Sequence, residues 1–188
     1  MLNIEYPKIE KKLFNDLELS LKEPKTKINL RGKKKDFFTK AGKILSLILP
    51  MEPNTSSTNE KFNALWLSPD EWLIYFDIND KNKVFNDLYD EISKLNYGSI
   101  TDVSNQWVCF NLKGKKIYDL LSAGSPFNFN DFKNNKNKVT QTLLNHIDVT
   151  INQKQLNYIK TCSFCVDLKK KLEDCTWKVI FVDSVTYT

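Results

Sequence analysis

The sequence predicts an α+β fold in which two similar halves follow one another within a single domain. One observation is the order of the periodic segments, which runs strand, helix, two strands, helix, strand and then repeats this plan with an extra strand. Another is a pair of apolar runs around residues 68–71, each with a tryptophan, which is typical of a β-hairpin because Pro69 presets the turn. Each half therefore matches a split βαβ unit of the ferredoxin-like kind, with helices on one face of an antiparallel or mixed sheet.

Residues 1–27 form an arm ahead of the two halves. The arm is rich in lysine and acidic residues, and only Leu13, Leu17 and Leu21 recur at a helical spacing. We therefore expect an extended arm with a short helix inside it. Such an arm has little apolar surface of its own to bury, so a neighbouring subunit is expected to order it.

The first half of the predicted domain covers residues 28–104. Each of its helices is predicted by apolar residues at three- and four-residue steps, which share one helix face. These residues are Phe37, Phe38, Ala41, Leu45 and Ile48 for a helix at 34–47, and Val84, Phe85, Leu88, Ile92 and Leu95 for a helix at 81–95. Pro50 ends the first helix, and Asp80 caps the second. Strands are expected at 28–31, 62–67, 72–77 and 100–103.

The second half covers residues 105–188. Strands are expected at 107–112, 139–144, 147–152, 156–160 and 177–182. A helix at 115–122, ending at Gly124, turns Ile117, Leu120 and Leu121 inward. A second helix is expected at about 162–175, with Cys165, Leu168 and Leu172 on one side.

Composition makes several classes of protein poor candidates. The 28 lysines and arginines exceed the 23 acidic residues by five, but the charges are interleaved, so a nucleic-acid partner is not expected. No segment approaches the roughly 20 apolar residues of a membrane-spanning helix. Together with a start that lacks an apolar signal core, this predicts a soluble cytoplasmic protein with no membrane partner. The four cysteines are then expected to be reduced thiols.

The glycines show no dinucleotide-binding pattern. They stand at positions 32, 42, 98, 114 and 124, and no two have the G-x-G spacing that brings backbone close to a pyrophosphate. No phosphate-binding loop occurs either. The sequence therefore predicts no flavin or nicotinamide site of the Rossmann kind.

Three groups of residues are candidates for chemistry, and each has a structural alternative. His146, the sole histidine, could be a catalytic base, but a place in a turn is favoured because no nucleophile accompanies it. Cys162 and Cys165 have the spacing of a zinc or redox pair, or they are buried thiols at a strand-to-helix turn. Phe127 and Phe129 could anchor a partner, or they could cover the chain's own core.

Five blocks in a particular order resemble the gamma subunit of heterotetrameric sarcosine oxidase. They are residues 49–55 (Leu-Pro-Met-Glu-Pro-Asn-Thr), the tryptophan hairpin at 63–76, residues 100–107 with Asp-Val-Ser, Gly-Ser-Pro at 124–126, and Gln-Thr-Leu-Leu at 141–144. The resemblance covers roughly residues 30–164. Each block alone is common, and their order makes the match specific.

This resemblance implies a noncatalytic structural subunit with no cofactor of its own. Its partners would be the larger alpha and beta subunits and a small delta subunit, with FAD, FMN, NAD and tetrahydrofolate on the larger ones. The complex would oxidatively demethylate sarcosine, a reaction of one-carbon metabolism. A related dehydrogenase that acts on another N-methyl amino acid, such as N-methylglutamate, is the alternative.

The gamma subunits in turn resemble the folate-binding domain of the glycine-cleavage T protein. Here Asp102-Val103-Ser104, followed by a β-rich run and Gly114, is similar to that domain's opening strand and turn. Residues 143–148 are similar to the segment that carries its folate-facing acid, which implies Asp148 as a folate candidate. The alternative is a solvated aspartate at a hairpin end. A free folate-binding one-carbon protein is therefore a second possible function.

Overall fold

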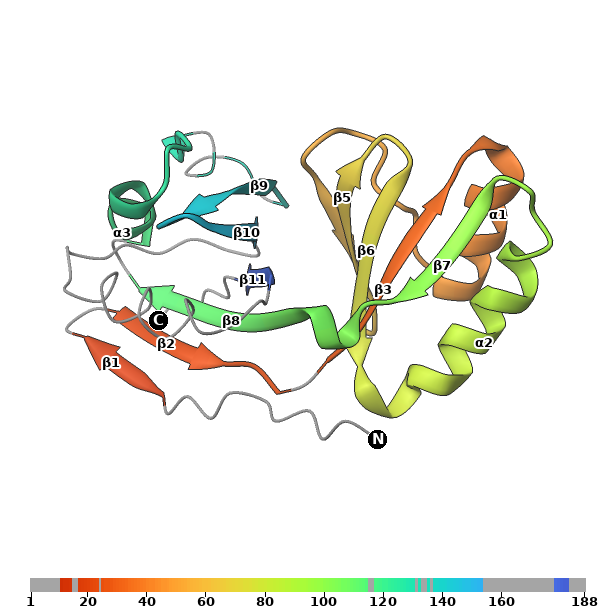
Figure 1. The fold of residues 1–188 in the computed structure, drawn as a ribbon, viewed down its shortest axis with the longest axis horizontal. Coiled ribbons are helices and arrows are strands. Elements are labelled where there is room, and N and C mark those ends of the chain that lie inside the picture. The colour runs from red at the N-terminus through yellow and green to blue at the C-terminus, as the bar shows by residue number, and fades with distance from the viewer. Residues whose placement is uncertain are drawn as a thin grey trace. The chain divides into compact units, whose positions relative to one another are not determined.

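The structure is a computed structural model that describes residues 11–14, 17–23, 25–114, 117–130, 132, 135, 137–153 and 178–182. Within these residues it has three α-helices and two β-sheets (Figure 1), so the predicted α+β class is confirmed. The chain divides into two compact units. Unit 1 combines Met1–Glu23 with Gln106–Thr188, and unit 2 is Pro24–Asn105.

Unit 2 has the predicted split βαβ arrangement. Its elements are β3 (Lys25–Gly32), α1 (Lys34–Leu45), β4 (Ser56–Thr58), β5 (Asn63–Ser68), β6 (Glu71–Asp77), a 3-10 turn η1 (Ile78–Asp80), α2 (Lys81–Ile92) and β7 (Gly98–Asp102). The strand order is β4-β5-β6-β3-β7, and all neighbours are antiparallel. Strand β6 therefore lies between β3 and β5, and the connection from β3 to β5 runs through α1 and then β4. Strand β4 is an addition that the sequence did not predict.

The core of unit 2 lies between its sheet and its two helices, which cover one sheet face (Figure 1). Helix α1 buries Phe37, Ala41 and Leu45 there, and helix α2 buries residues of its predicted stripe. On the sheet, Trp72 and alternate residues of β6 point into this core. Each fully buried leucine, isoleucine or phenylalanine side chain of this core contributes about 1.5–3 kcal/mol relative to an exposed one.

The end of α1 differs from the prediction. The helix stops at Leu45 because Ser46 adopts a left-handed conformation with φ of 47°, and the Leu47 N–H donates to the Gly42 carbonyl at 3.2 Å. This is the usual geometry of a helix C-terminus. The predicted inward position of Ile48 is wrong, since 85% of its surface is exposed.

Replacing Gly32 with alanine is expected to destabilise unit 2 by about 1–3 kcal/mol. Gly32 lies opposite Gly98 on the neighbouring strand, and a methyl group on Gly32 would overlap the ring of Phe37. The matched control is Gly42→Ala within α1, where the nearest atom would be 3.4 Å away. This control should stabilise the helix by up to about 1 kcal/mol. Urea unfolding of both variants measures the sign of each change in the free energy of unfolding. Equal changes for the two variants would contradict the packing around Phe37.

Unit 1 contains a mixed sheet. Its elements are β1 (Lys12–Phe14), β2 (Leu17–Leu21), β8 (Trp107–Gly114), α3 (Ile117–Gly124), β9 (Val139–Leu144), β10 (Ile147–Asn152) and β11 (Lys178–Val182). The strand order is β1-β2-β8-β11-β10-β9. Strand β11 lies between β8 and β10 and is parallel to both. The second half thus departs from the predicted split βαβ order, because β10 and β11 are adjacent and the long connection between them permits parallel pairing.

The N-terminal arm contributes strands to unit 1. The predicted helix around Leu13, Leu17 and Leu21 is wrong, because β1 and β2 form an antiparallel pair there. Strand β2 also pairs with β8, and Leu17 and Leu19 are buried in the core. The described part of the arm is therefore ordered by its own chain.

Part of the second half lies outside the described residues. This applies to the strand predicted at 156–160 and to the whole of the helix predicted at about 162–175. Cys162 and Cys165 both fall in this region, so their metal or redox role stays a prediction.

Candidate functional site

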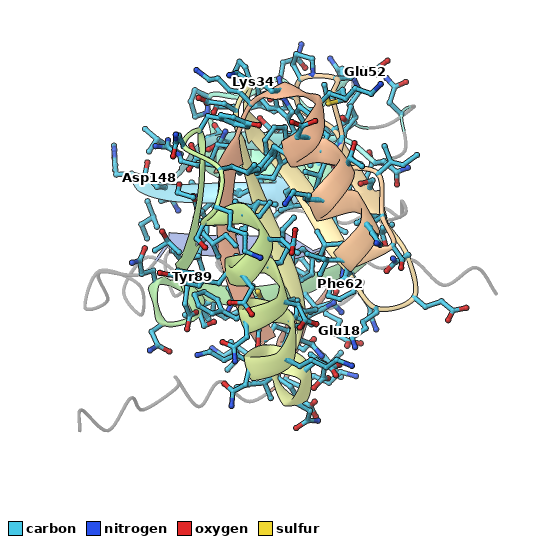
Figure 2. All side chains as sticks on the ribbon, turned by 90° about the vertical axis from the view of Figure 1, so that its right-hand side faces the viewer. Glu18, Lys34, Glu52, Phe62, Tyr89 and Asp148 are labelled. Atoms are coloured by element: carbon cyan, nitrogen blue, oxygen red, sulfur yellow. The ribbon has the colours of Figure 1, made fainter. Side chains whose placement is uncertain are left out.

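The candidate site is a cleft of about 410 Å³ in unit 1, beside the β9–β10 hairpin. Its lining consists of Trp107, Pro126, Gln141, Thr142, Leu143, Asp148, Val149 and Thr150. The volume lies within the range of about 300–1,000 Å³ that is usual for small-molecule sites. Asp148, which is labelled in Figure 2, lines this cleft and is the folate candidate predicted from the sequence.

The β9–β10 hairpin brings the polar side chains of this cleft together. Asp148 lies opposite Leu143, and Thr150 lies opposite Gln141. Because alternate strand residues share a face and opposite residues are close, these four side chains project from the same side of the hairpin. The site therefore combines a carboxylate, an amide and a hydroxyl with the apolar Leu143.

A hydrogen bond fixes the far wall of the cleft to the hairpin. The hydroxyl oxygens of Ser125 and Thr142 lie 3.1 Å apart, and the Phe127 N–H donates to Ser125 Oγ at 3.2 Å. Pro126 stands between these two anchored residues. The loop after α3 is thereby held against β9, which gives the cleft a defined wall.

His146 lies in the hairpin turn and does not line the cleft. Asn145 and His146 have φ angles of 48° and 70°, the left-handed pair that a two-residue hairpin turn requires. The Asn145 N–H donates to the Gly124 carbonyl at 2.8 Å. The position of His146 thus agrees with the turn interpretation.

Asp148 is the charged group of the cleft that is available to a ligand. It is exposed, and its carboxylate makes no hydrogen bond or ion pair with another described residue. A carboxylate of this kind accepts hydrogen bonds from N–H groups or pairs with a cation. With the indole of Trp107 and the side chain of Leu143 nearby, the cleft suits a flat ligand that carries N–H donors.

The phenylalanine cluster after α3 fills the core of unit 1. Phe129 and Phe132 are buried, and Phe127 is half-buried against them. The rings of Phe127 and Phe129 are 4.9 Å apart between centroids, and those of Phe129 and Phe132 are 5.8 Å apart, in edge-to-face geometry. Phe129 therefore covers the chain's own core, the alternative to partner anchoring that the sequence left open.

The Asp102-Val103-Ser104 block forms a hydrogen-bonded turn in unit 2. The Asp102 carboxylate accepts from the Ser104 N–H at 2.9 Å and from its hydroxyl at 2.5 Å, and it pairs with Lys81 at 2.6 Å. Ser104 Oγ in turn accepts from the Lys27 N–H at 3.0 Å. The block thus joins the ends of β3 and β7 to the start of α2, which is a structural role.

Replacing Asp102 with asparagine is expected to make unit 2 less sensitive to acid. Burial favours the neutral acid, but hydrogen bonds from Lys81 and Ser104 outweigh it, so the pKa of Asp102 lies below its ordinary value. The stabilisation by the ionised carboxylate is therefore complete above about pH 4 and is lost as the pH falls through the folded-state pKa.

The free energy of unfolding of the wild type, measured from pH 7 to pH 2, should fall more steeply at the acid end than that of the variant. The same exchange at Asp90, an exposed residue of α2, is the control. Parallel curves for wild type and Asp102→Asn would contradict the role of the turn.

The described residues form no metal centre. They bring together no three side chains of histidine, cysteine, aspartate or glutamate that could hold an ion. Cys109 on β8 is buried and forms no disulfide. In addition, no described helix is long and apolar enough to cross a membrane.

Comparison with known proteins shows the fold. The chain matches no family model and no curated protein. Its structure is similar to a chain of the heterotetrameric sarcosine oxidase from Corynebacterium sp. U-96, solved in complex with pyrrole 2-carboxylate. The TM-score is 0.64 at 19% sequence identity, and the match covers 71% of this chain and 68% of that chain. The α+β architecture implied by the sequence resemblance is therefore confirmed.

Proposed function

We propose that this chain is the gamma subunit of a heterotetrameric sarcosine oxidase. Its role would be structural: it supports assembly with alpha, beta and delta subunits, and FAD, FMN, NAD and tetrahydrofolate are held by the larger partners. The observation that carries the proposal is the similarity in fold to a chain of such an enzyme over 71% of this chain. The order of the five sequence blocks points to the same subunit independently.

Purification of the tagged chain from its native cells tests this proposal. We expect larger, yellow, flavin-containing proteins to copurify in fixed proportion, and the purified complex to consume oxygen when sarcosine is added. The isolated chain should turn over no sarcosine. A colourless monomer, or turnover by the chain alone, would contradict the structural role.

The substrate is tested with the same purified complex. A sarcosine oxidase transfers electrons to oxygen, whereas a dehydrogenase for another N-methyl amino acid requires a different acceptor. Oxygen consumption with sarcosine should therefore exceed that with N-methylglutamate. Activity that appears only with N-methylglutamate and an artificial acceptor would favour the dehydrogenase.

A free folate-binding one-carbon protein is the second candidate, and the position of Asp148 in the cleft favours it. The amino-pyrimidine edge of a folate presents two N–H groups, which a carboxylate accepts in bidentate fashion. Trp107 and Leu143 supply apolar walls for the ring. The cleft thus fits the ring system of such a ligand chemically.

Tetrahydrofolate titration of the isolated chain separates these two functions. A folate carrier should bind saturably, and Asp148→Asn should weaken binding by about tenfold or more, because a hydrogen bond to a charged group is lost. Asp119→Asn, an exposed aspartate of α3 outside the cleft, is the matched control. The absence of saturable binding would exclude the carrier and leave the structural subunit.

A further inference from the structure

We propose that the loop after α1, residues 46–55, docks into an apolar cavity of a partner protein that has lysine or arginine at its rim. We call this segment the α1–β4 loop. The inference rests on the proposed function, because it takes the partner to be one of the larger flavin-bearing subunits. It adds the place of contact and the chemistry of the surface that receives it.

Two large apolar side chains of the α1–β4 loop project into solvent. Ile48 is 85% exposed and Met51 is 62% exposed, whereas their neighbours Leu47, Leu49 and Pro50 are buried. The loop thus alternates between buried residues, which anchor it to unit 2, and residues whose side chains are exposed to solvent. Methionine is enriched at protein interfaces, and buried apolar anchors supply much of their binding energy.

Hydrogen bonds from side chains hold the loop backbone in place. The Trp72 indole N–H donates to the Pro50 carbonyl at 2.8 Å, inside the core, and Ser57 Oγ donates to the Ile48 carbonyl at 2.6 Å. The Asn59 amide donates to the carbonyls of Leu45 and Ser46, each at 3.0 Å. A preorganised loop loses little conformational entropy on binding, which favours affinity.

The charge pattern of this surface indicates the partner's chemistry. Residues 44–59 contain a single charged residue, Glu52, in a chain whose net charge is +5. Glu52, labelled in Figure 2, is exposed, and its carboxylate makes no ion pair with another described residue. Interface cores are depleted of charged residues in the same way.

A basic rim on the partner follows from this pattern. Along the rest of the chain lysines and acidic residues are interleaved, so a cationic group there meets charges of both signs, whereas at the α1–β4 loop it meets the carboxylate of Glu52 alone. Electrostatic complementarity of this kind fixes register and selects partners. The receiving surface should therefore be an apolar pocket for Ile48 and Met51 with a cation beside it.

Oxidation of Met51 reports directly on whether the loop is covered. The chain contains two methionines, Met1 and Met51, so peptide mass spectrometry resolves this site. With hydrogen peroxide we expect Met51 to be oxidised about tenfold more slowly in the flavin-containing complex than in the isolated chain, because susceptibility follows exposure. Equal rates in the two forms would overturn the inference.

Substitutions on the loop measure its share of the affinity. Ile48→Asp and Glu52→Lys should each reduce capture of the flavin-bearing subunits by about tenfold or more, as expected of an interface anchor. Ile78→Asp and Glu60→Lys are matched controls, since both are exposed residues of unit 2 outside the loop and should leave capture unchanged. The circular dichroism of every variant must match that of the wild type.

The outcomes separate this inference from the proposed function. Full capture of flavin-bearing subunits by both loop variants would refute only the docking role of the α1–β4 loop. The proposed function would remain. If the wild-type chain captures none, the proposed function fails and the inference fails with it. If Met51 of the isolated chain is protected at high concentration and exposed on dilution, a second copy occupies the loop and the inference is overturned.

Discussion

Trp72→Ala is expected to destabilise unit 2 by about 3–5 kcal/mol, the usual cost of removing a large buried aromatic side chain. Trp72 is only 1% exposed, and its ring lies 5.8 Å from that of Phe37 and 5.3 Å from that of Phe38 between centroids. Its indole also donates to the Pro50 carbonyl. The substitution therefore creates a cavity and leaves a buried acceptor unpaired.

Trp72→Phe separates these two effects. It keeps much of the ring volume but removes the hydrogen bond, so we expect a loss of about 1–3 kcal/mol. Trp66→Phe is the matched control, because Trp66 lies directly opposite on β5 and is only partly buried. Urea unfolding, monitored by hydrogen exchange of amides in unit 2, measures the free energy of unfolding of all three variants. A loss below about 1 kcal/mol for Trp72→Ala would contradict its place in the core.

Local sequence signals were sufficient where an element depends on its own periodicity. The hairpin of β5 and β6 was predicted because a turn signal stands between two apolar runs, and α2 because its buried residues recur at helical steps. The strands expected at 139–144 and 147–152 agree with β9 and β10. These elements bury one face whatever their neighbours are, so the pattern and the structure agree.

The N-terminal strands were missed because their pattern is ambiguous. Leu13, Leu17 and Leu21 are four residues apart, as on a helix face, while Leu17 and Leu19 alternate as on a strand. The pairing of β2 with β8, which is distant in sequence, makes the strand the stable choice. Pairing between remote segments is not visible in a local pattern.

The end of α1 shows a similar limit with a larger consequence. Ile48 continues the apolar stripe of the helix, but Ser46 takes a left-handed conformation that is unusual for a residue other than glycine or asparagine. The chain therefore leaves the helix axis before Ile48. A residue that the pattern predicts to be buried becomes the most exposed large apolar side chain among the described residues.

The candidate site was predicted only in part. Asp148 was identified from its resemblance to a folate-facing acid, but its neighbours in the cleft were not. Trp107 begins β8, and β11 separates that strand from β10 in the sheet. Which side chains meet across a sheet depends on the order of its strands. This order could not be derived from the sequence, because β11, the last strand in the chain, lies between β8 and β10.

Phe129→Ser tests whether the phenylalanine cluster serves the core or a partner. The ring of Phe129 is 2% exposed and contacts Tyr118, Phe127 and Phe132. Its removal should destabilise unit 1 by about 3–5 kcal/mol, since a large core side chain is lost. Phe127→Ser, at a half-buried position, should cost clearly less.

Hydrogen exchange of amides in β8 and β10 measures this loss in unit 1, and exchange in β3 and β6 of unit 2 serves as the internal control. The core interpretation requires faster exchange in the isolated Phe129→Ser chain, before any partner is added. The partner interpretation requires unchanged exchange in the isolated chain together with a loss of assembly. A ring that fills the core of unit 1 cannot also fill a partner's pocket without opening unit 1. Whether protection from exchange is lost in the isolated chain, or only assembly with the partner is lost, therefore decides which role Phe129 has.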